Sequence, residues 1–340
     1  MVKNGVVKSR NATPSAFGWD FQFNAAIVIM LDTIRDADEV KVEGDTQDIE
    51  VFLDSGEKIY AQAKSCMDPA DASNARRDLK SALTTLSEVT PIDQAKALIF
   101  ITNRIDPFNE VSTIRRFSGD YSQINYADLP DICKQYIQSV CEEKDLTLAK
   151  EKFSVFTFDF SGDEPNRYRI VKQRIVEFLE SLGELYTGLA QKTLDRWQGM
   201  FGKNASQTDR SRRISKKNMI WPIIVWMCAK GSHDWLEDYD EATCMEIRLN
   251  YDKVINEVSE SFEFVAKVMS EYATYQVQHK NLKQRDVTRN FISEKSMIFR
   301  DEFDLEGLDD VIVKAVMALT VEKVLRERFA IAKIKEAVKL

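Results

Sequence analysis

The chain has 340 residues, of which 44% are apolar and 30% are charged, with only 12 Gly and 7 Pro. This length accommodates two domains of ordinary size, and the composition excludes a disordered, collagen-like or repetitive chain. The net charge of −8 is unevenly distributed. Residues 1–160 carry 18 basic and 26 acidic side chains, whereas residues 161–340 carry 29 of each and are neutral overall. Clustered carboxylates do not attract phosphate without a cation. A nucleic-acid site in the first half would therefore need a divalent metal, and basic surface from the second half, another subunit or a partner.

The five cysteines form no C-x-x-C pair and the chain has only two histidines, which argues against a zinc site. The first ten residues are not followed by the apolar core of a signal peptide. The longest apolar run, residues 219–229, is too short to span a membrane and predicts a buried helix. These features predict a cytoplasmic protein with reduced cysteines and no membrane contact.

Apolar periodicity predicts alternating helices and strands up to about residue 183. The expected helices cover residues 16–35, 74–89, 131–143 and 165–183, and the expected strands cover 40–43, 47–53, 58–64, 96–103 and 152–160. Residues 104–130 are polar and contain Pro107, Gly119 and Pro130, which predicts an irregular segment. This order predicts an α/β domain with a mixed sheet flanked by helices.

After residue 186 only helical patterns occur, and no internal repeat is detectable. We therefore predict an α/β domain over residues 1–185 and an all-α domain over 186–340.

Polar side chains converge on the hairpin formed by residues 47–53 and 58–64. Alternation along the two strands places Asp48, Glu50, Gln62 and Lys64 on one face. Asp48 and the Gln62 side-chain oxygen, with the Ala63 carbonyl, suit a Mg²⁺ or Mn²⁺ ion. Lys64 could orient a nucleophilic water or neutralise developing charge, as phosphodiester hydrolysis requires. Solvated strand faces often carry such residues, so the spacing alone is a weak signal.

A basic segment, residues 203–217, is a second candidate site. It packs six basic side chains around the single Asp209. Such runs are usually solvated loops, and the functional alternative is contact with nucleic acid or a partner. The residues assigned to that contact are Arg210, Arg212, Arg213, Lys216 and Lys217.

The first half resembles the PD-(D/E)xK restriction-endonuclease-like superfamily, with glutamine in the E/Q position. More closely, it resembles the double-stranded DNA endonuclease domain of anti-phage effectors, found in CBASS systems and in the Lamassu A subunit. The resemblance covers residues 12–160 and rests on GWDFQFNAAIVIML, VEGDTQDIEV, IYAQAK and LIFITN. It implies Asp48 as metal ligand, Gln62 as the second motif residue and Lys64 as the catalytic lysine. It also implies that Gln22 supports the site and that Glu43 is a metal ligand or its neighbour.

Glutamine at position 62 removes a charge from the metal site, so Glu43 or Glu50 is expected to assist Asp48. The helical second half favours the Lamassu A subunit, whereas CBASS effectors carry a mixed α/β sensor domain. The resemblance then implies a DNA endonuclease that docks onto an SMC-like ATPase and an accessory subunit. It assigns partner binding or oligomerisation to the helical domain, residues 186–340. Assembly or release would control it, with self-association in the active state. The alternatives are a catalytically silent scaffold with the nuclease fold and a stand-alone restriction-like endonuclease.

Overall fold

The computed structural model describes residues 13–44, 46–163, 165–182, 188–209, 211–228, 240–303, 309–325 and 334–340. The chain divides into two compact units, Met1–Lys216 and Lys217–Leu340. The boundary predicted between residues 185 and 186 falls in residues 183–187, outside the described residues. The first compact unit continues past that point because the helix and the short strand that follow pack against its sheet.

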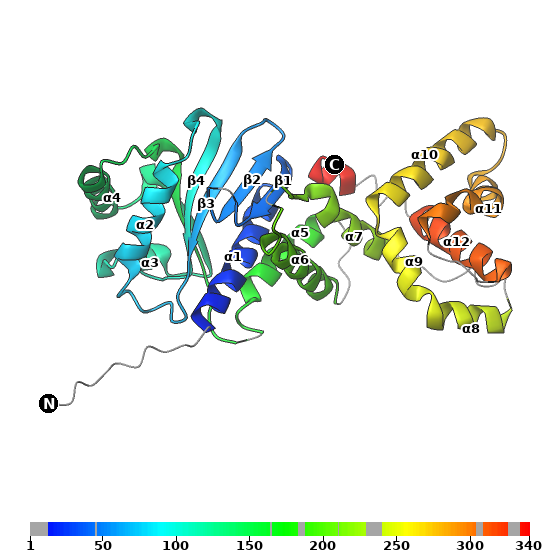
Figure 1. The fold of residues 1–340 in the computed structure, drawn as a ribbon, viewed down its shortest axis with the longest axis horizontal. Helices are drawn as coiled ribbons and strands as arrows, with labels where there is room; N and C mark the ends of the chain where they lie inside the picture. The colour runs from blue at the N-terminus through cyan, green and yellow to red at the C-terminus, as the bar shows by residue number, and fades with distance from the viewer. Residues whose placement is uncertain are drawn as a thin grey trace. The chain divides into compact units, whose positions relative to one another are not determined.

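The first unit is built on a seven-stranded mixed sheet with the strand order β5-β6-β4-β3-β2-β1-β7 (Figure 1). Strands β3, β4 and β6 run parallel to one another, and the remaining pairs are antiparallel. The strands are β1 (Ala37–Val42), β2 (Ile49–Leu53), β3 (Lys58–Lys64), β4 (Ala95–Thr102), β5 (Tyr121–Asn125), β6 (Phe153–Phe158) and β7 (Ile214–Ser215).

Helices cover both faces of this sheet. On one face, α2 packs on β3 and β4, and α4 contacts α2. On the other face α1 packs on β1, β2 and β3, and it also contacts α5 and α6. The helices of this unit are α1 (Thr13–Asp32), α2 (Ala75–Ser87), α3 (Ile114–Phe117), α4 (Asp131–Lys144), α5 (Arg169–Leu182) and α6 (Leu189–Ala205).

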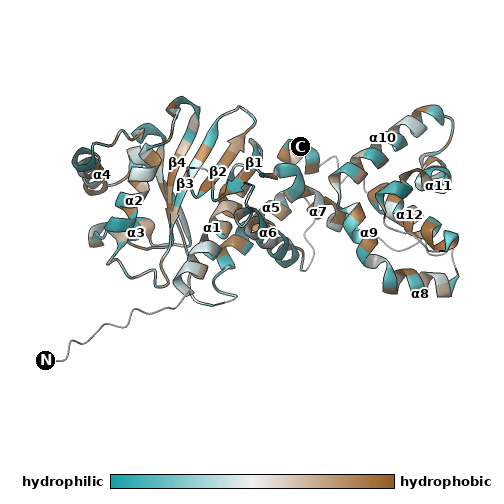
Figure 2. Ribbon diagram, viewed as in Figure 1, coloured by the Kyte–Doolittle hydropathy of each residue, from teal (hydrophilic) through white to brown (hydrophobic). Residues whose placement is uncertain are grey.

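The central strands are apolar on both sides because both faces of the sheet are covered. In β4, Leu98 and Phe100 point into the core shared with α2 and α4, and the intervening Ile99 and Ile101 are buried as well. The hydropathy colouring shows brown along these strands in the middle of the unit (Figure 2). This burial fixes the register of β3 against β4, and with it the position of the residues at the end of β3.

Two strands were not expected from the sequence. Strand β5 lies at the sheet edge, in the segment predicted to be irregular, and its residues are exposed or half-buried. Strand β7 has two residues and forms the other edge, where Ile214 is buried. Neither carries the apolar alternation that identifies a strand in a sequence, since edge strands have little buried surface.

The second unit is helical throughout its described residues, as predicted. Its helices are α7 (Lys216–Cys228), which begins at the last residue of the first unit, α8 (Glu241–Asn250), α9 (Asp252–Ser259), α10 (Phe262–Gln278), α11 (Gln284–Lys295) and α12 (Asp310–Leu325). The apolar run of α7 is buried, including Trp221 and Trp226, which confirms the predicted core helix. No helix among the described residues has the length and apolar character needed to cross a membrane.

The predicted architecture, an α/β domain with a mixed sheet followed by helices, is therefore confirmed. Assignment of the first unit to the restriction-endonuclease-like fold stays a prediction.

Candidate active site on the β2–β3 hairpin

Three of the predicted residues lie together where β2 begins and β3 ends. The antiparallel register of the two strands places Asp48 opposite Gln62. Asp48 Oδ2 accepts a hydrogen bond from the Ala63 backbone N–H at 2.9 Å, which fixes the carboxylate against β3. Lys64 Nζ lies 3.4 Å from Asp48 Oδ2 and 3.3 Å from Gln62 Oε1. A carboxylate, an amide oxygen and an ammonium group thus meet at one point, as the spacing predicted.

The Gln62 amide has two orientations with different partners. With its oxygen toward Lys64, that oxygen also faces the Asp48 carboxylate, so two acceptors lie side by side. With the amide turned over, its nitrogen donates to Asp48 Oδ2 at 3.2 Å and its oxygen accepts from the Asp48 N–H at 3.0 Å. The second orientation satisfies the metal-free site, whereas a cation between the two oxygens would select the first.

The Glu50 carboxylate accepts hydrogen bonds from the loop between β1 and β2. Glu50 is 5% exposed, and its Oε1 accepts hydrogen bonds from the Thr46 N–H at 3.3 Å and the Thr46 hydroxyl at 3.2 Å. The same oxygen lies so near Gly44 that a Cβ there would approach it to 2.5 Å. Glu50 therefore holds this loop through Oε1, and its role as a metal ligand stays a prediction.

Glu43 begins the same loop with a left-handed backbone conformation, φ 52°. Its N–H donates to the Asp48 carbonyl at 2.8 Å, so the backbone of Glu43 supports the backbone of Asp48. The side chain is half-buried. Glu43 is thus a neighbour of the site through its main chain, and its role as a ligand stays a prediction.

Gln22 lies half-buried on α1, on the helix layer that covers the other face of the sheet. Among the described residues, no hydrogen bond joins it to Asp48, Gln62 or Lys64. No hydrogen bond within the described residues therefore supports the predicted role of Gln22 at the site.

The donor atoms around Asp48 suit a hard cation that a substrate helps to hold. No group of three or more His, Cys, Asp or Glu in the described part of the chain is arranged to bind a metal. Asp48 supplies one carboxylate, and Gln62 and nearby carbonyls supply neutral oxygens. Mg²⁺ is commonly bound by one or two carboxylates together with substrate phosphates, and it keeps several waters. The donor set fits that kind of site, and it does not fit a metal bound permanently by protein alone.

Asn103, which the sequence did not single out, fixes the chain just after Lys64. Its side chain is 2% exposed, accepts from the Cys66 N–H at 2.9 Å and donates to the Cys66 carbonyl at 2.7 Å. It also donates to the Phe160 carbonyl at 2.8 Å. Asn103 is the polar residue that ends the apolar run of β4, and that position was the available signal in the sequence. Its partners Cys66 and Phe160 lie too far away in the sequence for a local pattern to reveal the contacts.

Cys66 lies beside the site, and burial raises the pKa of its thiol to about 11 despite the opposing effect of Arg104. Its Sγ donates to the Asp68 carbonyl at 3.0 Å. A raised pKa lowers the thiolate fraction at pH 8, so we expect alkylation by iodoacetamide about 100-fold slower than in the unfolded chain. Mass spectrometry of the Cys66 peptide, with and without urea, measures both rates. Equal rates would contradict the prediction.

The side chains of the basic segment lie in different environments in the folded chain. Arg210 lies outside the described residues. Arg212 is exposed and 3.5 Å from the Asp209 carboxylate. Arg213 pairs with Glu39 at 2.8 Å and stacks on the ring of Phe52.

Lys216, near the end of that segment, is buried, although it was predicted to contact nucleic acid or a partner at the surface. Its side chain is 4% exposed and lies 3.8 Å from the Asp54 carboxylate. It also donates to the Arg35 carbonyl. A run of charges suggested solvent exposure, but β7 pairs with β1 and carries Lys216 inward, so it does not fit the predicted surface contact. Lys217 is exposed and lies over the ring of Phe262.

A polar cavity of about 220 Å³, called here the Trp19 pocket, adjoins the β1–β2 loop. It is lined by Trp19, Lys41, Val42, Glu43, Gly44, Asn204, Ala205, Gln207, Asp209 and Arg212. It therefore joins Glu43, from the predicted site, to Arg212, from the basic segment.

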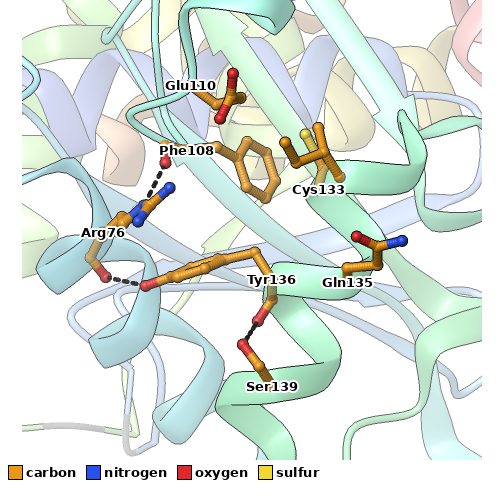
Figure 3. A pocket seen from close by; sticks show the side chains of 8 residues that line it. Arg76, Phe108, Glu110, Cys133, Gln135, Tyr136 and Ser139 are labelled. Atoms are coloured by element: carbon orange, nitrogen blue, oxygen red, sulfur yellow. Dashed lines mark hydrogen bonds between the residues drawn. The ribbon is translucent and has the colours of Figure 1, made fainter.

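A second cavity, of about 330 Å³, lies between α2, α4 and the loop around Phe108 (Figure 3). Arg76 donates to the Phe108 carbonyl at 2.9 Å and lies over the ring of Tyr136, whose hydroxyl donates to the Arg76 carbonyl. Cys133 on its wall is buried, and burial raises the pKa of its thiol to about 11. None of the predicted site residues lines this cavity.

Comparison with known proteins gives distant structural neighbours. No family model matches the chain, and no curated protein matches it. A Cap4 SAVED/CARF-domain containing receptor of Moraxella osloensis is 14% identical with a TM-score of 0.38, over 61% of this chain and 47% of the receptor. The Cap4 receptor of Acinetobacter baumannii, solved with the cyclic trinucleotide 3'3'3'-cAAA, is 13% identical with a TM-score of 0.38, over 61% and 45%. The chain spans less than half the length of these receptors.

Proposed function

We propose that the chain is a metal-dependent DNA endonuclease that serves as the effector of a bacterial anti-phage complex. The observation that carries the nuclease proposal is the meeting of Asp48, Gln62 and Lys64. Lys64 Nζ lies 3.4 Å from Asp48 Oδ2 and, when the Gln62 amide turns its oxygen toward it, 3.3 Å from that oxygen. The resemblance of residues 12–160 to the endonuclease domain of anti-phage effectors supports the biological role.

The chain's own residues have distinct tasks in this proposal. Asp48, held by the Ala63 N–H, presents a fixed negative charge to a cation. Gln62 adds an oxygen without adding charge, so its affinity for the cation is weaker than that of a carboxylate. Lys64 faces the same point and stabilises the charge that develops on the phosphate, or orients the attacking water.

Mg²⁺ or Mn²⁺, when bound, would polarise the phosphoryl oxygen and lower the pKa of a water. Asp48 is the carboxylate that meets Gln62 and Lys64 in the described part of the chain, so double-stranded DNA would supply phosphate oxygens to complete the ligand set. Binding of metal and of DNA would then depend on each other.

Control by assembly follows from the same charges. The first half of the chain has an excess of acidic residues, which weakens its own attraction for DNA. A partner complex, proposed as an SMC-like ATPase with an accessory subunit, would supply the missing basic surface and dock on the helical unit. Self-association of released chains would bring two sites together to cut both strands.

Replacing Lys64 by alanine tests the nuclease proposal. The loss of one stabilising charge is expected to slow cleavage of supercoiled plasmid in Mg²⁺ or Mn²⁺ about 100-fold. Lys80→Ala is the matched control, because Lys80 lies on α2 and pairs with Glu143. The assay should include the partner complex, since the isolated chain is proposed to be held inactive.

The outcomes separate the alternatives. Undiminished phage protection by Lys64→Ala would contradict catalysis and favour the scaffold. Discrete bands on a defined plasmid would favour the stand-alone restriction-like enzyme.

A further inference from the structure

The Trp19 pocket is a preformed cavity with one wall in common with the candidate active site. Glu43 lines the pocket, and its N–H donates to the Asp48 carbonyl at 2.8 Å. The opposite wall is fixed by Asn204, which accepts from the Val42 N–H at 3.2 Å and donates to the Arg212 carbonyl at 3.0 Å. The two walls are therefore held together by the buried side chain of Asn204 before any ligand arrives.

The lining offers three kinds of contact to a ligand. The ring of Trp19 is 42% exposed, which is unusual for so large an apolar side chain. Gln207 is exposed, and within the described part of the chain its side-chain amide has no hydrogen-bond partner. Arg212 is 68% exposed, and within the described part of the chain its guanidinium group contacts Asp209 at 3.5 Å. An aromatic face, an amide and a guanidinium group match the base and the phosphate of a nucleotide.

The size of the cavity limits what it can hold. At about 220 Å³ it is smaller than the roughly 300–1,000 Å³ of most small-molecule sites. Such a cavity suits one unit of a longer ligand better than a whole cofactor. Glu43 on its wall pairs through the backbone with Asp48, so that ligand would be the strand that occupies the candidate active site.

We propose that the Trp19 pocket binds one unpaired nucleotide of the DNA strand next to the bond that is cleaved. The base stacks on Trp19, Gln207 contacts its edge, and Arg212 contacts the adjoining phosphate. This inference rests on the proposed function. Stacking on the indole needs an open base face, so single-stranded or distorted DNA is preferred over a regular duplex.

Fluorescence anisotropy with a labelled, phosphorothioate-linked oligothymidylate of about 12 nucleotides in Mg²⁺ tests the pocket without cleavage. Trp19→Ala is expected to weaken binding about tenfold, and Trp19→Phe is expected to keep most of the affinity. Arg212→Gln is expected to reduce the slope of log affinity against log salt by about 0.7. Arg77→Gln, on the exposed surface of α2, is the matched control and should change neither quantity.

Binding of Trp19→Ala as tight as wild type, or tighter binding to the same strand annealed to its complement, would overturn the inference. A wild-type chain that binds no oligonucleotide would overturn it as well. If Trp19→Ala binds the oligonucleotide as tightly as the wild type, and the wild type still cuts plasmid, the pocket proposal is wrong and the nuclease proposal is unaffected. If Trp19→Ala weakens oligonucleotide binding but the wild type cuts no plasmid, the pocket proposal is supported and the nuclease proposal is wrong.

Discussion

Asp48→Asn is expected to reduce DNA cleavage by about 1,000-fold or more, the largest effect of any single change in the site. A bound metal contributes several kcal/mol to phosphodiester hydrolysis, and among the described residues the carboxylate that meets Gln62 and Lys64 is that of Asp48. Asparagine keeps an oxygen that can accept from the Ala63 N–H, so the hairpin should stay folded. Plasmid cleavage and thermal unfolding measure the two quantities separately.

The matched control is Asp54→Asn, in the turn after β2, where the carboxylate is 50% exposed. Its cleavage rate should equal that of the wild type. A variant at Asp48 that cuts DNA as fast as the control would remove Asp48 from the catalytic role.

Asp78→Ala is expected to destabilise the first unit by about 3–5 kcal/mol, because it leaves the buried Arg104 without its anion. Arg104 is 4% exposed, its Nη2 lies 2.9 Å from Asp78 Oδ2, and it also donates to the Asp71 carbonyl. This ion pair joins α2 to the end of β4, close to the candidate site. Urea unfolding followed by circular dichroism gives the free energy of unfolding.

Two further variants check the cause of that loss. Arg77→Ala removes a 73% exposed partner of the same carboxylate and should change stability by less than about 0.5 kcal/mol. Arg104→Met combined with Asp78→Ala should recover part of the lost stability, because no charge is then left buried alone. A double variant no more stable than Asp78→Ala would show that the ion pair is not the source of the effect.

The sequence predicted the β2–β3 hairpin and the meeting of Asp48, Gln62 and Lys64 because strand alternation is a local property. Asp54, Ser55 and Gly56 mark the turn, and the two-residue period then decides which side chains share a face. The parallel partner β4 was recognisable from its continuous apolar run.

Features that depend on distant segments were not predictable in this way. Glu50 was expected to assist a metal, but the loop at Gly44 and Thr46 folds back onto its carboxylate. Lys216 was expected at the surface, but pairing of β7 with β1 carries it inward. The contacts of Asn103 with Cys66 and Phe160 likewise join segments that no local pattern connects.

The extent of the first unit follows the same rule. The change from mixed to purely helical patterns suggested a boundary after residue 185, yet α6 packs on α1 and β1 within the first unit. A helix that covers a sheet and a helix of an all-α domain carry the same apolar periodicity. Only the packing partner distinguishes them.

In the proposed function, Asp48 and Gln62 bind a divalent cation together with DNA phosphate. The most direct test is an anomalous-difference map from crystals grown with Mn²⁺ and a phosphorothioate DNA. We expect a Mn²⁺ ion bonded to the Asp48 carboxylate and the Gln62 side-chain oxygen, present with DNA and absent without it. DNA bound beside Lys64 with no Mn²⁺ at Asp48, or Mn²⁺ bound elsewhere on the chain, would contradict it.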